Sequence, residues 1–425
     1  MDITKATSLK GEITVPGDKS ISHRSIMIGS LAEGVTEVRN FLMGEDCLSS
    51  MDCFRKMGVD ISIDGDLVKI KGVGIKGLKK PEEMLYAGNS GTTIRLISGI
   101  LSAQNFECSL DGDSSIRKRP MKRIIDPLTL MGADIKSIND NGCAPLKIVG
   151  GNLKGISYAS PIASAQVKSA ILLAGLYADG VTTVTEPVLS RNHTELMLKA
   201  FGADIKTDGA TATVTATQSL KALNITVPGD ISSAAFFMVA GLIVPDSEVL
   251  IKNVGINPTR DGMIEIIKKM GGNIEILNRR LEGFEETADI LVKTSELKGI
   301  TIEGDIIPRI IDEIPVIAVM AACAQGETII KDAEDLKNKE SDRISYIAKN
   351  LQNMGGDITP TEDGMIIQGG KPLRGCVIDT CNDHRIAMSF AIAGLVANGK
   401  TEIPEDECIN ISYPGFKNNL NLLIH

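Results

Sequence analysis

The stretch GEITVPGDKSISHR, residues 11–24, contains the strongest local structural signals in the chain. Alternating apolar residues at its start predict a strand. Pro16-Gly17 ends that strand, because proline lacks a ladder donor and glycine permits a sharp turn. A helix is expected to follow, with Asp18 or Ser20 as its N-cap. Free backbone N–H groups and the helix dipole would make this helix start a suitable place for an anion.

The same turn recurs about halfway along the chain. Residues 13–18, ITVPGD, reappear as residues 225–230. The second copy continues as ISS, so it lacks the two cations of the first copy, Lys19 and Arg24. The repeated turn predicts an internal duplication. Because only one copy has the cations, we infer that this copy is the functional one, although an ordinary turn with a polar rim would have a similar sequence.

A second pattern, an amphipathic helix followed by an apolar residue, a glycine and a strand, occurs five times. Each glycine suits the position just after a helix, where a left-handed backbone is needed. A sixth helix is expected at 416–423, closed by the N-terminal strand. Six units with a halfway repeat predict two domains of three units each, formed by residues 1–15 with 228–425 and by residues 16–227. The glycines are Gly58, Gly132, Gly202, Gly271 and Gly355.

Composition restricts the class of protein. The 425 residues, 43% hydrophobic and 23% charged, are typical of a globular protein with more than one core. The absence of tryptophan and the net charge of −9 argue against nucleic acid as a partner. The eight cysteines have no zinc-site spacing. The N-terminus lacks the apolar segment of a signal peptide, and the longest apolar runs, about a dozen residues, are too short to span a membrane. These features predict a reduced, cytoplasmic protein.

The candidate functional residues are charged side chains at expected strand-to-helix junctions. If the helix N-termini share one face, the cations among them converge on a cleft between the domains and suit a ligand with phosphate and carboxylate groups. Asp312 and Glu340 lie near such cations in the sequence and are candidates for proton transfer. Each cluster on its own could be a solvated turn or a helix cap. The cations are Lys19, Arg24, Arg119, Arg343 and Arg385.

Six motifs, in this order, make the chain resemble the EPSP synthase (3-phosphoshikimate 1-carboxyvinyltransferase) family over essentially its full length. The resemblance implies a two-domain inside-out α/β barrel of six βαβαββ repeats, three per domain. Helices would lie inside and sheets outside, with the active site in the interdomain cleft. The motifs are PGDKSISHR at 16–24, GNSGTTIR at 88–95, RKRP at 117–120, SAQVKSA at 164–170, KESDR at 339–343 and NDHRIAM at 382–388.

The resemblance also implies a reaction. The enolpyruvyl group of phosphoenolpyruvate would pass to the 5-hydroxyl of shikimate 3-phosphate by addition and elimination through a tetrahedral intermediate, with release of phosphate. This reaction belongs to the shikimate pathway to chorismate and the aromatic amino acids. The resemblance further implies that no metal or organic cofactor is needed. Together with the composition, the expectation is a cytoplasmic monomer with no nucleic-acid or membrane partner.

Site roles are carried over from the family motif by motif. Asp312 would take the hydroxyl proton, while Glu340 and Lys19 would handle protons at C3 and at the leaving phosphate. The resemblance implies that shikimate 3-phosphate contacts Lys19, Ser20, Arg24, Ser164, Gln166, Ser190, Asp312 and Lys339. It implies that phosphoenolpyruvate contacts Lys19, Asn89, Gly91, Arg119, Gln166, Arg343 and Arg385.

Some positions depart from the pattern of well-known bacterial members. Ala165 replaces a second serine, His193 replaces a tyrosine, and Ile411 replaces a lysine that touches the phosphoenolpyruvate phosphate. These changes bear on substrate affinity more than on the reaction. Gly91 is the residue usual in glyphosate-sensitive members, so the resemblance predicts a glyphosate target.

Two other functions fit parts of the sequence. The related enolpyruvyl transferase that acts on UDP-N-acetylglucosamine usually has a cysteine acid in the loop before the RP motif. Here that loop, residues 111–115, has no cysteine, and Cys108 lies in the preceding strand. A non-catalytic anion-binding protein would need the cations but neither Asp312 nor Glu340.

Overall fold

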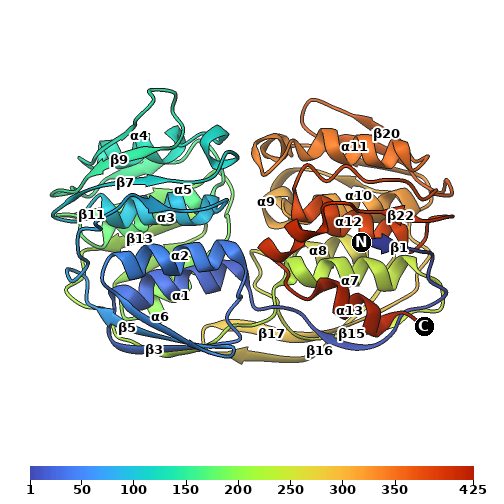
Figure 1. Cartoon of the computed structure of the whole chain (residues 1–425), viewed down its shortest axis with the longest axis horizontal. Helices are drawn as coiled ribbons and strands as arrows, with labels where there is room; N and C mark the ends of the chain where they lie inside the picture. Colours follow the sequence, from blue (N-terminus) through green and yellow to red (C-terminus); the bar gives the residue numbers. More distant parts are fainter. The chain divides into compact units, whose positions relative to one another are not determined.

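The chain passes twice between two structural units, and both crossings lie in the repeated ITVPGD sequence. The computed structural model describes residues 1–425. Unit 1 comprises Met1–Pro16 and Pro228–His425, and unit 2 comprises Gly17–Val227 (Figure 1). At the first crossing, a Cβ on Gly17 would lie 1.9 Å from the carbonyl oxygen of Asn40. Only glycine fits there, because the two backbones lie in direct contact.

Unit 2 consists of three repeats, each with two helices and a four-stranded sheet. In every sheet the first two strands are parallel, and the last two strands add in antiparallel fashion. The first repeat contains α1 (Lys19–Leu31), β3 (Glu33–Arg39), α2 (Glu45–Lys56), β4 (Asp60–Asp64), β5 (Leu67–Val73) and β14 (Asn224–Thr226). The second contains β6 (Leu85–Tyr86), α3 (Gly91–Leu101), β7 (Glu107–Asp111), α4 (Lys122–Leu130), β8 (Asp134–Ser137) and β9 (Leu146–Val149). The third contains β10 (Ser157–Ala159), α5 (Ala165–Gly175), β11 (Val181–Thr185), α6 (His193–Ala200), β12 (Ile205–Asp208) and β13 (Thr211–Thr215).

Unit 1 repeats the same order of elements, with short extra helices between some of them. Its first repeat contains β2 (Lys10–Thr14), α7 (Ile231–Ile243), β15 (Glu248–Gly255), α8 (Gly262–Lys269), β16 (Asn273–Glu282) and β17 (Glu285–Lys293). Its second contains β18 (Thr301–Ile302), α9 (Ile307–Ile310), α10 (Ile314–Cys323), β19 (Glu327–Ile330), α11 (Arg343–Asn353), β20 (Asp357–Pro360) and β21 (Met365–Gln368). Its third contains α12 (His384–Gly394), β22 (Thr401–Glu402), α13 (Phe416–Leu423) and β1 (Asp2–Ile3). Four 3₁₀ segments are η1 (Ile116–Lys118), η2 (Gly304–Ile306), η3 (Glu334–Asn338) and η4 (Asp406–Ile411).

In each unit, the first strand of the first sheet pairs with a strand that is far from it in the sequence. β2, before the first crossing, pairs in parallel with β15, so that Ile13 lies opposite Ile251. β14, before the second crossing, pairs in parallel with β3, so that Ile225 lies opposite Val38. Figure 1 shows the blue N-terminal segment running along β15. The two copies of ITVPGD therefore have the same structural role. The first copy joins β2 of unit 1 to α1 of unit 2, and the second joins β14 of unit 2 to α7 of unit 1.

The sixth repeat differs from the expected βαβαββ unit. Its sheet is reduced to β1 and β22, which pair over two residues each. The segment that would form its first strand makes only isolated bridges, such as Val377 with Glu402. Pro372 in this segment has no N–H to donate to a ladder. The other five sheets are open and four-stranded, so none closes into a barrel.

Each repeat combines one helix that is buried all round with one amphipathic helix. All eleven residues of α12 are buried, and nearly all of α3, α5, α7 and α10 are buried as well. Sequences that are apolar around the whole helix fit only inside a core. A Cβ on Gly99 in α3 would lie 2.1 Å from the carbonyl oxygen of Ala170 in α5, so these two helices touch backbone to backbone.

The helix ends follow the sequence pattern. All five predicted glycines have a positive φ, between +83° at Gly355 and +97° at Gly132, as the left-handed position after a helix requires. At the start of α1, Asp18 and not Ser20 is the N-cap, and its carboxylate accepts a hydrogen bond of 2.8 Å from the N–H of Ile21. Asp230 is likewise the N-cap of α7, where its carboxylate accepts a hydrogen bond of 2.8 Å from the N–H of Ser232, which matches the duplicated turn.

Candidate active site

In unit 2, the N-termini of three buried helices meet. α1 begins at Lys19, α3 at Gly91 and α5 at Ala165. Arg24 of α1 donates to the hydroxyl of Ser169 in α5 at 2.9 Å, and Arg95 of α3 donates to Gln166 in α5. Three helix N-termini held together in this way give a concentration of positive backbone dipole, which favours an anion.

The motif at the start of α1 contributes both surface and buried groups. Lys19 is 18% exposed and pairs with Asp46. The hydroxyl of Ser20 accepts a hydrogen bond from Arg191. Arg24 is 2% exposed and donates to the hydroxyl of Thr194 at 2.6 Å and to the carbonyl oxygen of Ser20 at 3.0 Å. Arg24 therefore holds the Ser20 backbone in place, in addition to any contact with a ligand.

His23 in the same motif is neutral at physiological pH. Burial, helped by the charges of Lys19 and Arg24, holds its pKa well below the ordinary value. Its Nδ1 lies 2.8 Å from the hydroxyl of Ser50 in α2. The contact joins α1 to α2 and gives His23 a structural role.

A second group of predicted residues surrounds the start of α3. Asn89 accepts a hydrogen bond of 2.7 Å from Arg119 through Oδ1 and donates one of 2.7 Å to Asp113 through Nδ2. Arg119 also donates to Ser115 at 3.1 Å. A Cβ on Gly91 would lie 3.3 Å from Nη1 of Arg119 and would crowd it. The glycine thus leaves room for the guanidinium beside the helix start.

The two predicted serines, Ser164 and Ser190, lie on either side of a carboxylate that the sequence analysis missed. Glu186 accepts hydrogen bonds from the backbone N–H of Ser164 at 2.9 Å and of Ser190 at 3.1 Å. Glu186 follows β11 with no local motif, so no sequence signal pointed to it. Arg191, also missed, belongs to the polar cluster RNHT at the start of α6, and that cluster was the available signal.

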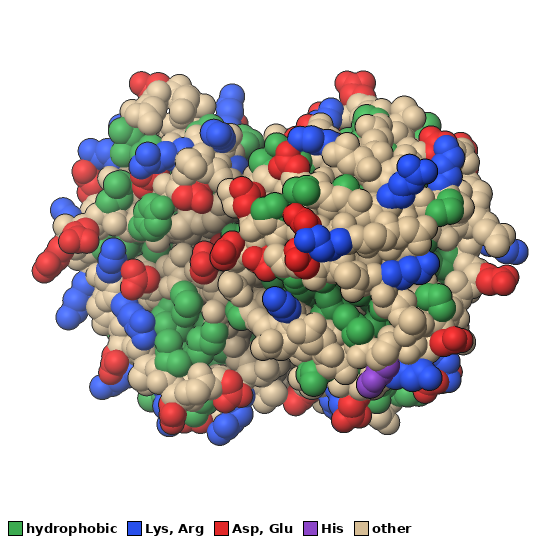
Figure 2. Space-filling view, turned by 45° about the vertical axis from the view of Figure 1, so that its right-hand side comes forward, with side chains coloured by type: hydrophobic (Ala, Val, Ile, Leu, Met, Phe, Trp, Pro, Cys, Tyr) green, Lys and Arg blue, Asp and Glu red, His purple; other side chains and the backbone are tan.

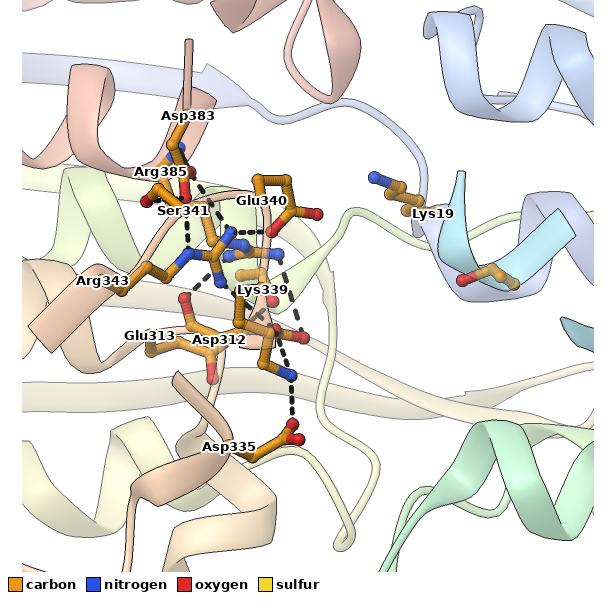
Figure 3. Close-up of polar contacts among 12 residues, drawn as sticks. Lys19, Asp312, Glu313, Asp335, Lys339, Glu340, Ser341, Arg343, Asp383 and Arg385 are labelled. Carbon is orange, nitrogen blue, oxygen red and sulfur yellow. Dashed lines mark hydrogen bonds and ion pairs between the residues drawn. The ribbon is translucent and has the colours of Figure 1, made fainter. Parts of the chain in front are cut away.

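In unit 1, Asp312 lies among four cations, of which Figure 3 labels Lys339, Arg343 and Arg385. Nη1 of Arg260 and Nη1 of Arg343 are each 3.8 Å from its carboxylate, Nζ of Lys339 is 3.9 Å away, and Nη2 of Arg385 is 4.0 Å away. Arg385 also donates to the carbonyl oxygen of Asp312 at 3.0 Å. The Asp312 side chain is 21% exposed, so a ligand can reach it. An anion added here would meet several cations at once.

Arg343 is the buried centre of this group, with its side chain 1% exposed (Figure 3). It donates to Asp383 at 2.8 and 3.2 Å and to Glu340 at 2.6 Å. Burial opposes the charge of Arg343, but Asp383 and Glu340 raise its pKa above the ordinary value. Asp383 also accepts from the hydroxyl of Ser341 at 3.0 Å and from the N–H of Arg385 at 2.9 Å. One carboxylate therefore places two arginines of the predicted site.

Each predicted site residue falls into one of two clusters, one in each unit. The three residues that depart from the family pattern are also placed: Ala165 starts α5, His193 is buried at the start of α6, and Ile411 is half-buried at the end of η4. Unit 1 holds Asp312, Lys339, Glu340, Arg343 and Arg385. Unit 2 holds Lys19, Ser20, Arg24, Asn89, Gly91, Arg119, Ser164, Gln166 and Ser190.

Two other kinds of functional feature, a metal-binding group of side chains and a membrane-spanning helix, are not found in the structure. No three His, Cys, Asp or Glu side chains are grouped so that they could hold a metal ion. No helix has the length and apolar character needed to cross a membrane. Acidic and basic side chains are interspersed on the face drawn in Figure 2, and apolar side chains form separate small groups there.

A comparison with known protein families matches residues 3–420 to the model of EPSP synthase, 3-phosphoshikimate 1-carboxyvinyltransferase. The chain belongs to the EPSP synthase family. A family member from Thermoanaerobacter sp., named 3-phosphoshikimate 1-carboxyvinyltransferase, is 56% identical over 423 residues and covers all of both chains. One from Brevibacillus brevis with the same name is 56% identical over 97% of each chain. A solved EPSP synthase from Acinetobacter baumannii superposes with a TM-score of 0.88 at 51% identity, over 99% of this chain and 97% of that one.

Proposed function

We propose that this protein transfers the enolpyruvyl group of phosphoenolpyruvate to the 5-hydroxyl of shikimate 3-phosphate and releases phosphate, in the shikimate pathway to chorismate. The match to the EPSP synthase family over residues 3–420 carries this proposal. The two cationic clusters support it, because both substrates carry phosphate and carboxylate groups that arginine binds in bidentate fashion. We expect no metal or organic cofactor.

The shikimate 3-phosphate contacts are proposed from both clusters. Ser164 is the N-cap of α5, and Gln166 lies in the first turn of this helix. The backbone N–H groups of Ser164 and Ser190 both donate to Glu186, so the two serines lie close together. These three residues therefore suit the phosphate. The remaining contacts are proposed from the α1 motif and from the Asp312 cluster. They are Lys19, Ser20, Arg24, Asp312 and Lys339.

The phosphoenolpyruvate contacts are proposed at the arginines. Arg119 is held by its hydrogen bond to Asn89 and lies next to Gly91, so it suits one of the two anionic groups of phosphoenolpyruvate. Arg343 and Arg385 together suit the other anionic group. The further proposed contacts are Lys19 and Gln166. Fixed cations also stabilise the charge that builds up on the tetrahedral intermediate.

Proton transfer is assigned to three side chains. Asp312 is proposed to take the proton of the 5-hydroxyl as this oxygen attacks C2, since its carboxylate is partly exposed and lies within 4.0 Å of four cations that could also hold the anionic groups of the substrates. Glu340 and Lys19 are proposed to handle the proton that adds to C3 and the proton on the leaving phosphate. Glu340 is 17% exposed and is fixed by Arg343, which suits a group that must both touch a ligand and keep its position.

We further propose that the two units act as the two domains of an inside-out α/β fold, with residues 1–15 and 228–425 in one and 16–227 in the other. Substrates would bind where the two domains face each other. This arrangement would let domain closure exclude water before the chemistry begins. We propose that the enzyme works as a cytoplasmic monomer.

The test is phosphate release by the purified protein from phosphoenolpyruvate, with shikimate 3-phosphate or UDP-N-acetylglucosamine as the acceptor. Release with shikimate 3-phosphate alone is expected. Release only with the nucleotide sugar would overturn the choice of acceptor. If neither acceptor gives release with a folded protein, the enzymatic function is wrong and a binding protein remains. Asp312→Asn separates these cases further, because an enzyme loses turnover whereas a binding protein has no turnover to lose.

A further inference from the structure

Glu186 connects two residues of the proposed phosphate site. Its side chain is fully buried, directly after β11. Oε1 accepts the backbone N–H of Ser164 at 2.9 Å, and Oε2 accepts the backbone N–H of Ser190 at 3.1 Å. The hydroxyl of Ser190 lies 2.7 and 2.8 Å from the two oxygens. One carboxylate thus fixes the backbone at the start of α5 and in the loop before α6.

A buried lysine neutralises this carboxylate. Nζ of Lys168 lies 2.8 Å from Oε2 of Glu186 and 2.8 Å from Oε1 of Glu195, and it donates to the carbonyl oxygen of Ser190 at 3.3 Å. The Lys168 side chain is 1% exposed and that of Glu195 is 4% exposed. Such a buried set is maintained only when its charges are paired and hydrogen-bonded. Lys168 belongs to the SAQVKSA motif, but none of the three ionic groups was assigned a role from the sequence.

We propose that Glu186 is a positioning residue that sets the affinity for the phosphate group of shikimate 3-phosphate by holding Ser164 and Ser190 in place. The proposal rests on the proposed function, which assigns these two serines to that phosphate. The Ser164 hydroxyl accepts from the N–H of Val167 as the N-cap of α5, so its own hydrogen is free to point at a ligand. Its direction depends on the Ser164 backbone, which Glu186 fixes.

The same geometry defines how Ser190 takes part. A carboxylate only accepts hydrogen bonds, so the Ser190 hydroxyl is the donor in its contact with Glu186. To donate to a phosphate, this hydroxyl must turn away from Glu186. The backbone N–H of Ser190 stays on Oε2 of Glu186 during that turn and keeps the serine in place. Binding therefore exchanges one hydrogen bond of the Ser190 hydroxyl for another, while the positions of both serines still depend on Glu186.

Two isosteric substitutions distinguish the positioning of the two serines from the loss of a negative charge beside Lys168. In Glu186→Gln, the amide has one accepting and one donating end, so one of the two serine N–H groups faces another donor. In Glu195→Gln, the oxygen that contacts Lys168 can remain, and the NH₂ group takes the place of Oε2, which has no hydrogen-bond partner. Both changes remove one buried negative charge beside Lys168, but only Glu186→Gln disturbs the serines.

The experiment is calorimetric titration of each full-length variant with shikimate 3-phosphate, together with KM for phosphoenolpyruvate. Glu186→Gln is expected to weaken shikimate 3-phosphate binding by about tenfold or more, as loss of a hydrogen bond to a charged group does. Glu195→Gln is expected to stay within about twofold of wild type, because its hydrogen bonds are retained. The KM for phosphoenolpyruvate should change little in either variant. Unphosphorylated shikimate, as a second ligand, should lose no affinity.

A structural role alone would give a different result. Equal Kd values for Glu186→Gln and Glu195→Gln, or equal losses for shikimate and shikimate 3-phosphate, would overturn the positioning role while turnover by the wild type leaves the proposed function standing. If wild-type protein releases no phosphate from its two substrates, the proposed function and the phosphate role of the serines fail together. Should Glu186→Gln not fold, Glu186→Asp keeps the charge beside Lys168 but shortens the reach to the serines. The same loss of shikimate 3-phosphate affinity is expected for it, and wild-type affinity would overturn the proposal.

Discussion

Replacing Asp383 with asparagine tests how the arginine cluster of unit 1 is held. The side chains of Asp383 and Arg343 are 0% and 1% exposed and share hydrogen bonds of 2.8 and 3.2 Å. Removing one partner of a buried ion pair costs about 3–5 kcal/mol. Arg343 keeps its contact with Glu340, so we expect the lower end, about 3 kcal/mol. Asparagine is also a good N-cap, so the start of α12 should survive and the effect should come from the lost charge.

The assay is thermal unfolding by calorimetry. For a folding unit of about 200 residues, each kcal/mol lowers Tm by about 2–4 °C, so Asp383→Asn should lower Tm by about 6–12 °C. The matched control is Asp357→Asn, which breaks the exposed pair with Lys371. Exposed pairs contribute about 0–1 kcal/mol, so the control should shift Tm by no more than about 4 °C. Equal Tm shifts in the two variants would refute the view that the carboxylate of Asp383 offsets the free-energy cost of burying the Arg343 guanidinium.

Three other outcomes follow from the same geometry. Glu340→Gln should lower kcat for phosphate release by about 10²–10⁴-fold, the usual contribution of a proton-transfer group, and a change within about threefold would contradict its role. Gly91→Ala should raise the KM for phosphoenolpyruvate and weaken competitive inhibition by glyphosate, because the added methyl lies 3.3 Å from Nη1 of Arg119; wild-type enzyme unaffected by millimolar glyphosate would refute the inhibitor prediction. Burial alone would raise the pKa of Asp383, but Arg343 and His384 hold it below the ordinary value, so its contribution to stability is complete above about pH 4 and is lost as pH falls. Denaturation by urea across this range should show a weaker acid dependence for Asp383→Asn than for wild type, and equal slopes would contradict the assignment.

The local features of the fold could be predicted because they depend on a few residues each. The glycines after the amphipathic helices, such as Gly58 and Gly132, were predicted from their spacing, and all five have the left-handed backbone. The last helix was expected at 416–423 and forms as α13 over Phe416–Leu423. The pairing of the N-terminal strand with the second half of the chain was expected too, and β2 pairs with β15. Turns and caps have strong local sequence preferences, which explains these results.

Features that depend on tertiary contacts could not be predicted in the same way. Glu186 has no motif around it, and its importance comes from two serines that the fold brings to it. Asp383 stood out only as part of NDHR, whereas its contact with Arg343 joins α11 to the start of α12. Arg24 looked like a ligand for substrate from its charge, but its position shows an additional structural task inside unit 2. Charge and spacing identify candidate residues, but they do not distinguish a residue that binds substrate from one that holds its neighbours in place.

The exchanged strands also determine the order in which the chain can fold during synthesis. The ribosome releases β2 early, but its partner β15, which begins at Glu248, follows more than two hundred residues later. Unit 2 is one continuous segment, Gly17–Val227, so it can close as soon as β14 emerges to pair with β3. Until β15 emerges, the N-terminal strand remains an open edge that other chains could pair with. A nascent chain that has emerged from the ribosome beyond residue 227 but not yet as far as residue 248 would therefore carry a finished second unit and an exposed strand, a state in which a chaperone bound near the N-terminus would protect it from aggregation.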